Sequence, residues 1–569
     1  MIKDKLKKKL INALKKINVG VDEKLIDLQP PNLLSFGDYS TSIALKLAKN
    51  LKQNPLNIGK KIINNLAKDE LIEKVDLIKP GFINFWLSKK TLFSNLYQQA
   101  NNIFLFSSFS FGPNKKILIE YAQPNTHKLF HIGHLRNITL GEALARIFEV
   151  LGYKIIRTNY QGDIGLHIAK CLWAIKKEQE KNKNILDNFK TISQKIEFIG
   201  KMYTKGTKAY EDNPKAKEEI IEINKQIYNQ DEKILSLWQI TRKWSLDYFA
   251  EIYQKLDTTF DRLYFESEMA KRAIDICHDA LKKGILEKSQ GAIVFNGKKY
   301  GLDTRVFINS LGYPTYEGKE LALAEKEFSD FGEIDKNIHT VTPEQTSFFK
   351  VTFKVEELID EKKYKDKQYH LAYEWVKLKT GKMASREGNI IETNWLINEI
   401  KKKIIQDFNS DEKTAETLAI SSAKYSFLKN SPQTVIYFDI DESIAVDGNS
   451  APYLIYTYVR CQSVFNKSQE LKVKSQKLKS KIENEELLLI RKLYHFPDVV
   501  LRAAQQLSPN LIASYLYEVA SVYNLFYQKN PILKANEETR NLRLAITQAT
   551  ANVIKKGLYL LGIKTVEKM

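Results

Sequence analysis

One strand–helix–strand segment constrains the fold of this chain more than any other part of the sequence. Residues 117–121 are apolar or aromatic apart from Glu120, as in a short buried strand. A loop follows, then a long apolar segment with helical spacing over residues 133–151, and residues 155–159 indicate a second strand. A strand, a long helix and a strand in this order predict a parallel β-sheet in an α/β domain that binds a nucleotide.

The sheet is expected to continue beyond these two strands. Residues 292–295, 305–309 and 369–378 have the composition of further strands. Residues 180–285 are rich in charged and helix-forming residues, so we expect a helical insertion that interrupts the sheet. We therefore assign residues 113–408 to one Rossmann-like domain with a parallel sheet.

A smaller domain is expected at each end of the chain. Residues 1–112 predict a small α/β domain, in which residues 38–52 have helical spacing and residues 80–87 read as a turn followed by a strand. Residues 409–569 contain amphipathic helical segments, which predict an all-α bundle. The sequence has no internal repeat and no Pro- or Gly-rich linker, so these boundaries rest on changes of pattern.

The composition narrows the class of protein. A length of 569 residues with 43% apolar residues allows three or four domains with their own cores. No apolar run reaches about 18 residues, and the start lacks the apolar core of a secretory signal, so we expect no membrane span and a cytoplasmic location. The lysines near the start leave a mitochondrial presequence as the alternative, against which Asp4 argues. Three widely spaced cysteines predict buried free thiols.

The net charge of +20 bears on the kind of partner. A basic surface attracts phosphate backbones and strengthens salt-dependent binding of nucleic acid. The sequence is also rich in Lys, Ile and Asn, so a general compositional bias is the alternative explanation. Charge alone therefore favours a nucleic-acid partner only modestly.

Residues 120–134 have the strongest chemical signature. They lead from a predicted strand to the start of a predicted helix, where unpaired N–H groups and the positive end of the helix dipole bind phosphate. His131 and His134 can donate hydrogen bonds to one ligand and stabilise charge on a transferring phosphate, while Lys128 adds a cation. Gly133 lets a flat ring approach the backbone. Two alternatives are that the histidines only cap a helix, or that they bind zinc, although no cysteine lies nearby. We expect no metal ligated by the protein itself.

The same segment resembles a known family. Residues 131–134 read His-Ile-Gly-His and are similar to the HIGH signature of class I aminoacyl-tRNA synthetases. The preceding run Glu-x-x-x-Pro-Asn-x-x-Lys resembles the arginyl branch of that class. The resemblance implies that Asn125 binds the amino acid and that Lys128 contacts phosphates. It also implies an ATP site that includes Pro124, His131, Gly133 and His134.

A second signature of the class is expected in a loop after the last strand of the sheet. Residues 381–389 resemble the family's KMSKS loop in a degenerate form, in which Ala384 replaces a serine and Ser385 stands where the second lysine would be. Many arginyl enzymes lack that lysine and carry one just before the HIGH signature. Alone, such a turn is more often a solvated loop. The resemblance implies that Met383 helps to bind ATP and that pyrophosphate is neutralised by Lys128, Lys382 and Arg386.

The resemblance also implies a pocket for the amino acid. The guanidinium of arginine is planar and permanently charged, so it requires carboxylates. Glu120 would form one wall, and Tyr316 with Glu320, one helical turn apart, would form another. The family usually has Asp at the position of Glu320, so its contact is expected to be rearranged; the alternative is an ordinary solvated acid. Gln345 also matches a substrate position, and the aromatic-His region after it reads Phe-Phe at residues 348–349.

The resemblance covers nearly the whole chain. Residues 36–41 and 80–85 are similar to the family's N-terminal domain, which contacts the tRNA elbow, and residues 451–460 are similar to the start of its anticodon-binding bundle. Residues 159–165 resemble its Asn-Tyr-x-Gly-Asp-Trp-Gly turn, with Ile in place of Trp. Tyrosines of the bundle would stack on anticodon bases, or else form its core: Tyr453, Tyr456, Tyr458, Tyr517, Tyr523 and Tyr527.

The family resemblance implies two-step aminoacylation. ATP, with Mg²⁺ on its phosphates, would activate L-arginine, and the acyl group would pass to the terminal adenosine of tRNA(Arg). The resemblance also implies a monomer. Two other functions stay open: a class I synthetase for another amino acid, and a tRNA-binding paralogue without enzymatic activity.

Overall fold

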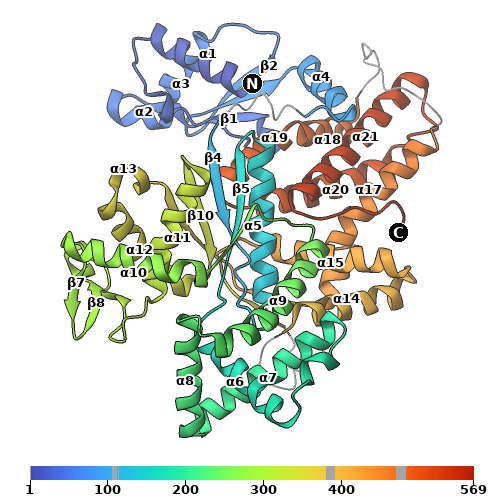
Figure 1. Ribbon diagram of the computed structural model, residues 1–569. Helices are drawn as coiled ribbons and strands as arrows, with labels where there is room; N and C mark the ends of the chain where they lie inside the picture. Colours follow the sequence, from blue (N-terminus) through green and yellow to red (C-terminus); the bar gives the residue numbers. More distant parts are fainter. Residues whose placement is uncertain (1, 32, 105–111, 113, 380–390, 469–481) are drawn as a thin grey trace.

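A five-stranded parallel sheet forms the centre of the molecule (Figure 1). The computed structural model describes residues 2–31, 33–104, 112, 114–379, 391–468 and 482–569. All four neighbouring strand pairs of this sheet are parallel, which confirms the predicted fold class. In spatial order the strands are β11 (Gln368–Ala372), β10 (Lys336–Val341), β4 (Lys116–Glu120), β5 (Lys154–Gln161) and β6 (Arg262–Phe265).

Helix α5 (Ile132–Val150) lies between the sheet and the C-terminal helices (Figure 1). Its side chains are buried on nearly every face, because it packs on the sheet on one side and on the bundle on the other. The central strand β4 has a continuous apolar run that includes Leu118 and Ile119, both fully buried, as in a strand covered on both faces. The other helices that flank the sheet are α10 (Glu266–Lys282), α11 (Tyr316–Phe331), α12 (Thr346–Ile359) and α13 (Glu361–Tyr364). Helix α6 (Leu166–Lys181) follows β5 and packs against the helices of the insertion instead.

The predicted insertion is helical, with one departure. Helix α7 ends at Asp212, and helix α8 begins at Pro214. The side chain of Asn213 caps the start of α8, and proline is favoured in the first turn of a helix, so these two residues separate the helices. Residues 262–265, however, form the edge strand β6 of the central sheet, so the expected helical segment 180–285 also contributes a strand. The charged residues around this four-residue strand hid its signal. The insertion helices are α7 (Ile192–Asp212), α8 (Pro214–Tyr228) and α9 (Glu232–Lys255).

The strands expected near residues 292–309 are present but belong to another sheet. They form a small antiparallel sheet in the order β7-β8-β9, outside the central sheet. Its strands are β7 (Glu287–Ser289), β8 (Ala292–Phe295) and β9 (Arg305–Ile308).

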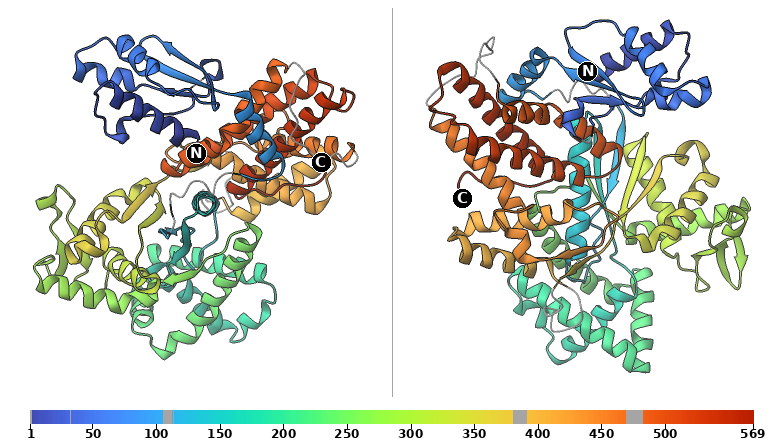
Figure 2. Two further views of the ribbon diagram at one scale, coloured as in Figure 1. Left: turned by 90° about the horizontal axis from the view of Figure 1, so that it is seen from above. Right: turned by 180° about the vertical axis from the view of Figure 1, so that it is seen from behind.

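The N-terminal elements form a three-stranded antiparallel sheet with helices. The single helix expected over residues 38–52 is instead a short strand followed by a helix, because Ser42 interrupts the segment and the buried face of the helix begins at Ile43. Figure 1 and Figure 2 place this region at one end of the molecule and the insertion at the other. Its elements are α1 (Ile2–Lys16), β1 (Tyr39–Thr41), α2 (Ile43–Leu51), α3 (Pro55–Asn64), β2 (Ile72–Ile78) and β3 (Phe82–Leu87).

The C-terminal part is a helical bundle, as expected. One short strand, β13 (Ile436–Phe438), pairs in parallel with β12 (Val376–Leu378). Helix α4 (Lys89–Ala100) packs against α18 and α21 of the bundle. The helices are α14 (Thr393–Phe408), α15 (Glu412–Leu428), α16 (Ile440–Ile444), α17 (Ala451–Asn466), α18 (Asn484–Tyr494), α19 (Phe496–Gln505), α20 (Asn510–Lys529) and α21 (Glu537–Leu560).

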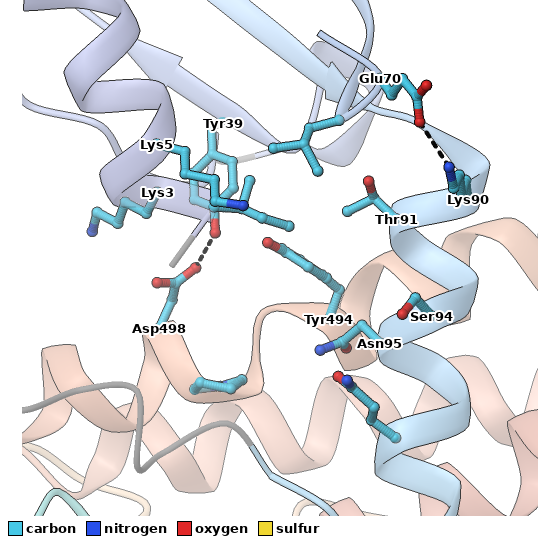
Figure 3. Close-up of a pocket in the computed structure, with 14 residues that line it drawn as sticks. Lys3, Lys5, Tyr39, Glu70, Lys90, Thr91, Ser94, Asn95, Tyr494 and Asp498 are labelled. Carbon is cyan, nitrogen blue, oxygen red and sulfur yellow. Dashed lines mark hydrogen bonds and ion pairs between the residues drawn. The ribbon is translucent and has the colours of Figure 1, made fainter.

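A cavity of about 380 Å³ lies where the N-terminal sheet meets α4, α18 and α19 (Figure 3). The hydroxyl of Tyr39 donates a hydrogen bond of 2.6 Å to Asp498, which joins β1 to α19 across the sequence. Lys3 and Lys5 of α1 line the same cavity. The N-terminal region is therefore attached to the bundle through polar contacts around a partly open space.

Two further expectations concern the whole chain. Cys171, Cys277 and Cys461 are all buried free thiols, as predicted. Within the described part of the chain, no helix is both long and apolar enough to cross a bilayer.

Arg136 on α5 holds three separate segments together. Its guanidinium donates hydrogen bonds to the backbone carbonyls of Glu374, Phe427 and Pro432, at 3.0, 2.9 and 3.2 Å. The side chain is buried, and burial lowers its pKa to about 10, so it remains charged at neutral pH. Removing it would leave three carbonyls without this donor, a cost of about 1 kcal/mol or more for each.

We predict that Arg136→Met destabilises the protein by about 3 kcal/mol, which lowers the unfolding temperature by at least about 3 °C. Arg272→Met is the matched control, because Arg272 forms a solvent-exposed ion pair with Glu325 that is worth less than about 1 kcal/mol. Thermal unfolding followed by calorimetry measures both variants. Equal shifts would show that the three carbonyl contacts add nothing to stability.

Candidate active site

The loop between β4 and α5 has a strained backbone. Ala122, Gln123 and His127 have φ angles of 76°, 48° and 62°, in the left-handed region that non-glycine residues rarely occupy. Neighbouring side chains hold this shape: Asn137 accepts a hydrogen bond of 2.7 Å from the N–H of Ala122, and Asn159 accepts one of 3.0 Å from Gln123. Strain of this kind is maintained where a side chain or backbone group must be held in one place, as in an active site.

His127 attaches the loop to the insertion. Its backbone N–H donates to the hydroxyl of Ser245 at 2.9 Å, and its ring Nε2 lies 2.8 Å from the hydroxyl of Thr241, both on α9. Burial, with a smaller contribution from the charge of Arg242, lowers the pKa of His127 to about 3. The ring is therefore neutral and fully engaged in a structural contact.

His131 and His134 form a reciprocal cap at the start of α5. The Nδ1 atom of His131 accepts the N–H of Gly133 at 3.1 Å, and the Nδ1 atom of His134 accepts the N–H of His131 at 3.1 Å. The two rings are stacked, with centroids 3.8 Å apart. Because both Nδ1 atoms accept hydrogen bonds, the ring proton of each lies on Nε2.

The capping interpretation and the functional interpretation are thus compatible, since the cap uses Nδ1 and leaves Nε2–H as a donor. Burial, and then the charge of Lys128, lower the pKa of His131 to about 4. Burial, then His131 and Lys128, lower the pKa of His134 well below its ordinary value. Both imidazoles are therefore neutral hydrogen-bond donors at physiological pH.

The predicted residues before the histidines line the same loop. Pro124 is buried, and the ammonium of Lys128 lies 5.4 Å from the ring centroid of Tyr203 on α7. Within the described ranges, no carboxylate lies within ion-pair distance of Lys128. Its charge is therefore available to an anionic ligand.

Asn125 is held against the turn after β5. It forms an isolated parallel bridge with Gly162, and a Cβ atom on Gly162 would lie 2.0 Å from its Oδ1 atom. The N–H of Thr126 also donates to the carbonyl of Gly162 at 2.9 Å. Only glycine permits this approach, so the predicted turn at residues 159–165 positions Asn125.

Glu120 and Glu320, which the sequence assigns to two walls of the amino-acid pocket, both lie in the interior. Their exposed fractions are 2% and 6%, so Glu320 is not the solvated acid of the alternative interpretation. His339 on β10 lies between them: its Nδ1 atom is 3.2 Å from Glu120 and 3.7 Å from Glu320. One donor or acceptor atom from each of these three residues lies within 4.8 Å of the others.

Further buried acids surround this group and were missed by the sequence analysis. Burial raises the pKa of Glu356 to about 8, and burial together with the charge of Glu120 raises that of Glu327 to about 8. Asn337 and Gln368 donate hydrogen bonds to them at 2.7 Å. No local sequence pattern identifies Glu327 or Glu356, because an acidic residue within a helix is usually exposed to solvent.

The other predicted amino-acid contacts are more exposed. Tyr316 begins α11 and has 62% of its side chain exposed, with the ammonium of Lys319 4.6 Å from its ring centroid. Gln345 ends a short 3₁₀ turn, Pro343–Gln345, and is exposed. Phe349 is buried, and its ring packs 5.1 Å from that of His339. Tyr316 and Gln345 thus lie outside the buried carboxylate group.

The second signature falls outside the described residues. Lys382, Met383 and Arg386 belong to residues 380–390, which the structure does not describe. The strand that precedes them, β12, is paired with β13. Their predicted roles stay predictions.

The six tyrosines expected to stack on anticodon bases divide into three groups. Tyr453 and Tyr517 are half-buried, and their ring centroids are 5.6 Å apart. Tyr458 and Tyr523 are buried and belong to the core. Tyr456 and Tyr527 have 40% of their side chains exposed, and the guanidinium of Arg460 lies 4.7 and 5.2 Å from their ring centroids. These two rings therefore form an exposed aromatic and cationic surface.

Family models match three parts of the chain. The catalytic domain of class I tRNA synthetases (R) matches residues 103–439, the N-terminal domain of arginyl-tRNA synthetases matches residues 4–87, and the DALR anticodon-binding domain matches residues 454–569. The catalytic-domain match alone covers more than half of the chain.

Individual proteins are similar over almost the full length. The arginine–tRNA ligase of Fusobacterium nucleatum is 30% identical over 94% of each chain, and that of Halothermothrix orenii is 30% identical over 100% of this chain and 99% of its own. The solved arginyl-tRNA synthetase of Thermus thermophilus, 23% identical, has the same fold over 100% of both chains with a TM-score of 0.82. The strand-to-helix site, the parallel sheet and these matches together place the chain in the arginyl-tRNA synthetase family of class I aminoacyl-tRNA synthetases.

Proposed function

We propose that this chain is an arginine–tRNA ligase that uses ATP to join L-arginine to tRNA(Arg). The observation that carries the proposal is the placement of two neutral imidazole donors at the start of α5 and two buried carboxylates, Glu120 and Glu320, at the neighbouring strand and helix. One end of this site suits phosphate and the other suits a guanidinium cation.

The amino acid is bound at the carboxylate end in this proposal. Glu120 and Glu320 accept hydrogen bonds from the guanidinium, and Asn125 binds the polar groups at the other end of arginine. Tyr316 and Gln345, which are exposed, would contact the ligand from the outside of the pocket. A buried, doubly hydrogen-bonded guanidinium discriminates strongly against shorter or neutral side chains, because they would leave the buried carboxyl of Glu320 without a hydrogen-bond partner.

The ATP phosphates are bound at the start of α5. The Nε2–H groups of His131 and His134 donate to oxygens of the α-phosphate, where negative charge increases when the arginine carboxylate attacks. The backbone beside Pro124 and Gly133 contacts the nucleotide. Catalysis then depends on positioning and charge stabilisation, without a covalent intermediate on the enzyme.

The leaving pyrophosphate requires cations. Lys128 is available for this role, and we assign Lys382 and Arg386, together with Met383 at the nucleotide, from the sequence. Mg²⁺ would bind with the ATP phosphates and neutralise part of their charge. The side chains at the start of α5 are hydrogen-bond donors and a lysine, which fit phosphate oxygens and not a metal, so no residue is assigned as its ligand.

The tRNA completes the reaction. A ribose hydroxyl of its terminal adenosine attacks the arginyl-adenylate and displaces AMP. We propose that residues 1–112 and 409–569 bind other parts of the tRNA and that residues 113–408 carry the chemistry. Stacking of anticodon bases on Tyr456 and Tyr527 fits their exposure better than it fits the buried tyrosines. A monomer in the cytoplasm is part of the same proposal.

The function is tested by charging total tRNA with ATP and each of the twenty amino acids in turn. Incorporation of arginine alone is the expected result. Incorporation of another amino acid would overturn the substrate, and a folded protein that binds tRNA without charging it would favour a non-enzymatic paralogue.

We predict that His134→Ala lowers arginine-dependent ATP–pyrophosphate exchange at least tenfold, because a donor to the α-phosphate is lost. The substitution also removes a helix cap, so His134→Asn serves as the matched variant: its Oδ1 atom can replace Nδ1 in the cap, but it lacks Nε2–H. We expect His134→Asn to restore the unfolding temperature and not the exchange rate. Near-normal exchange in either variant would contradict the role of His134.

We predict that Gly162→Ala raises the KM for arginine at least tenfold, because the added methyl group displaces Asn125. Gly448→Ala is the control, since its added methyl would meet only Ala445 at 3.8 Å. Steady-state exchange kinetics with varied arginine measures both. An unchanged KM with a normal kcat in Gly162→Ala would exclude Asn125 from arginine binding.

A further inference from the structure

His339 is in contact with both carboxylates of the amino-acid pocket. Besides the distances to Glu120 and Glu320, its ring is enclosed by Phe349 and Phe353 of α12, with centroids 5.1 and 5.4 Å away. The residue is 1% exposed. It is therefore fixed in the pocket wall and has no room to turn away from the two acids.

The hydrogen-bond geometry defines the charge of this ring. Nδ1 faces the carboxylate of Glu120, and Nε2 lies 3.0 Å from the amide oxygen Oε1 of Gln368. The amide nitrogen of the same Gln368 donates to Glu356 at 2.7 Å, which leaves its oxygen for the histidine. Both ring nitrogens thus face acceptors, and only the doubly protonated imidazolium can donate to both.

We propose that His339 is a positioning residue for arginine: its imidazolium neutralises Glu120, so that the incoming guanidinium obtains its balancing charge from Glu320. This inference rests on the proposed function for the identity of the ligand. With this role, His339 explains why a ligand with one positive charge faces two acidic residues: Glu120 is already paired with a cation of the protein, and Glu320 is left for the guanidinium.

The electrostatics of the group are consistent with this role. Burial opposes the charged form of His339, but its hydrogen bond with Glu120 and the charges of Glu120, Glu320 and Glu327 outweigh burial and raise its pKa to about 10. Burial, and then the charge of Glu120, raise the pKa of Glu320 well above its ordinary value. The titratable groups around His339 and its two acids are Glu120 of β4, Tyr160 of β5, Glu320 and Glu327 of α11, Glu356 of α12 and His370 of β11.

The binding of arginine changes the protonation of this group of residues in the proposal. In this proposal, the imidazolium of His339 balances the carboxylate of Glu120 when no ligand is bound, and the buried carboxyl of Glu320, which shares that same imidazolium at 3.7 Å, keeps its proton. The bound guanidinium adds one positive charge, so the Glu320 carboxyl loses its proton to solvent. If His339 is replaced by an uncharged residue, Glu120 alone balances the guanidinium and no proton leaves.

The test is titration calorimetry of arginine binding without ATP or Mg²⁺, in buffers of different ionisation enthalpy, with EDTA present. For the unaltered chain we expect release of about one proton for each arginine bound, and an affinity that rises about tenfold per pH unit while Glu320 is protonated in the free protein. His339→Asn keeps a side-chain N–H near the position of Nδ1, and we expect binding with no proton release and no such pH dependence. His370→Asn on the adjacent strand is the control and should behave like the unaltered chain.

Each outcome separates the possibilities. Proton release that is absent in the unaltered chain, or retained in His339→Asn, would overturn the role of His339 while leaving the arginine site intact. Arginine binding that occurs in a parallel titration without EDTA and is lost with EDTA would assign the three residues to a metal instead. Failure to bind arginine, together with failure to charge tRNA, would overturn the proposed function and this inference together. Equal unfolding temperatures of the two Asn variants exclude misfolding as the cause of a difference.

Discussion

At the start of α5, the imidazole of His131 occupies the N-cap position that Ser, Thr, Asp or Asn fill in most helices, and the imidazole of His134 occupies the N3 position of the capping box. Their Nδ1 atoms complete the backbone hydrogen bonds of the first turn, and their Nε2–H groups remain free to serve a ligand. Burial keeps both rings neutral, which fixes the direction of these donors. Because α5 is buried between sheet and bundle, this cap has a fixed position relative to β4 and the strained loop, and the rest of the site is built around it.

The site has opposite electrostatic character at its two ends. The start of α5 presents N–H donors and Lys128, whereas the region between β4, β10 and α11 contains carboxylates with one internal cation, His339. A ligand with an anionic and a cationic end is therefore oriented before any chemistry begins. Burial strengthens the selection against ligands of the wrong charge. The desolvation free energy of an unpaired charge in either region would exceed the stabilisation from its contacts.

The sequence predicted the parts of this arrangement that are local. The β4–loop–α5 unit, the two histidines and the burial of Glu120 follow from patterns over fewer than 40 consecutive residues, and the structure agrees with them. His339 could not be found in this way. It faces Glu120 only because β10 and β4 are neighbours whose register places these two residues opposite each other. Strand β6 escaped detection for a related reason, since four residues at a sheet edge carry too little pattern to be read.

The pairing of β12 with β13 makes the chain less divisible than its sequence suggests. The segment that leads to Lys382 has its strand partner at residues 436–438, and Arg136 beneath it binds carbonyls of Phe427 and Pro432. A fragment that ended at residue 408 would lose that partner and uncover one side of α5. The smallest part of the chain that can fold with this active site therefore includes the first helices after the Rossmann-like sheet. A truncation or a gene fusion would preserve the site only if it left the chain intact through β13.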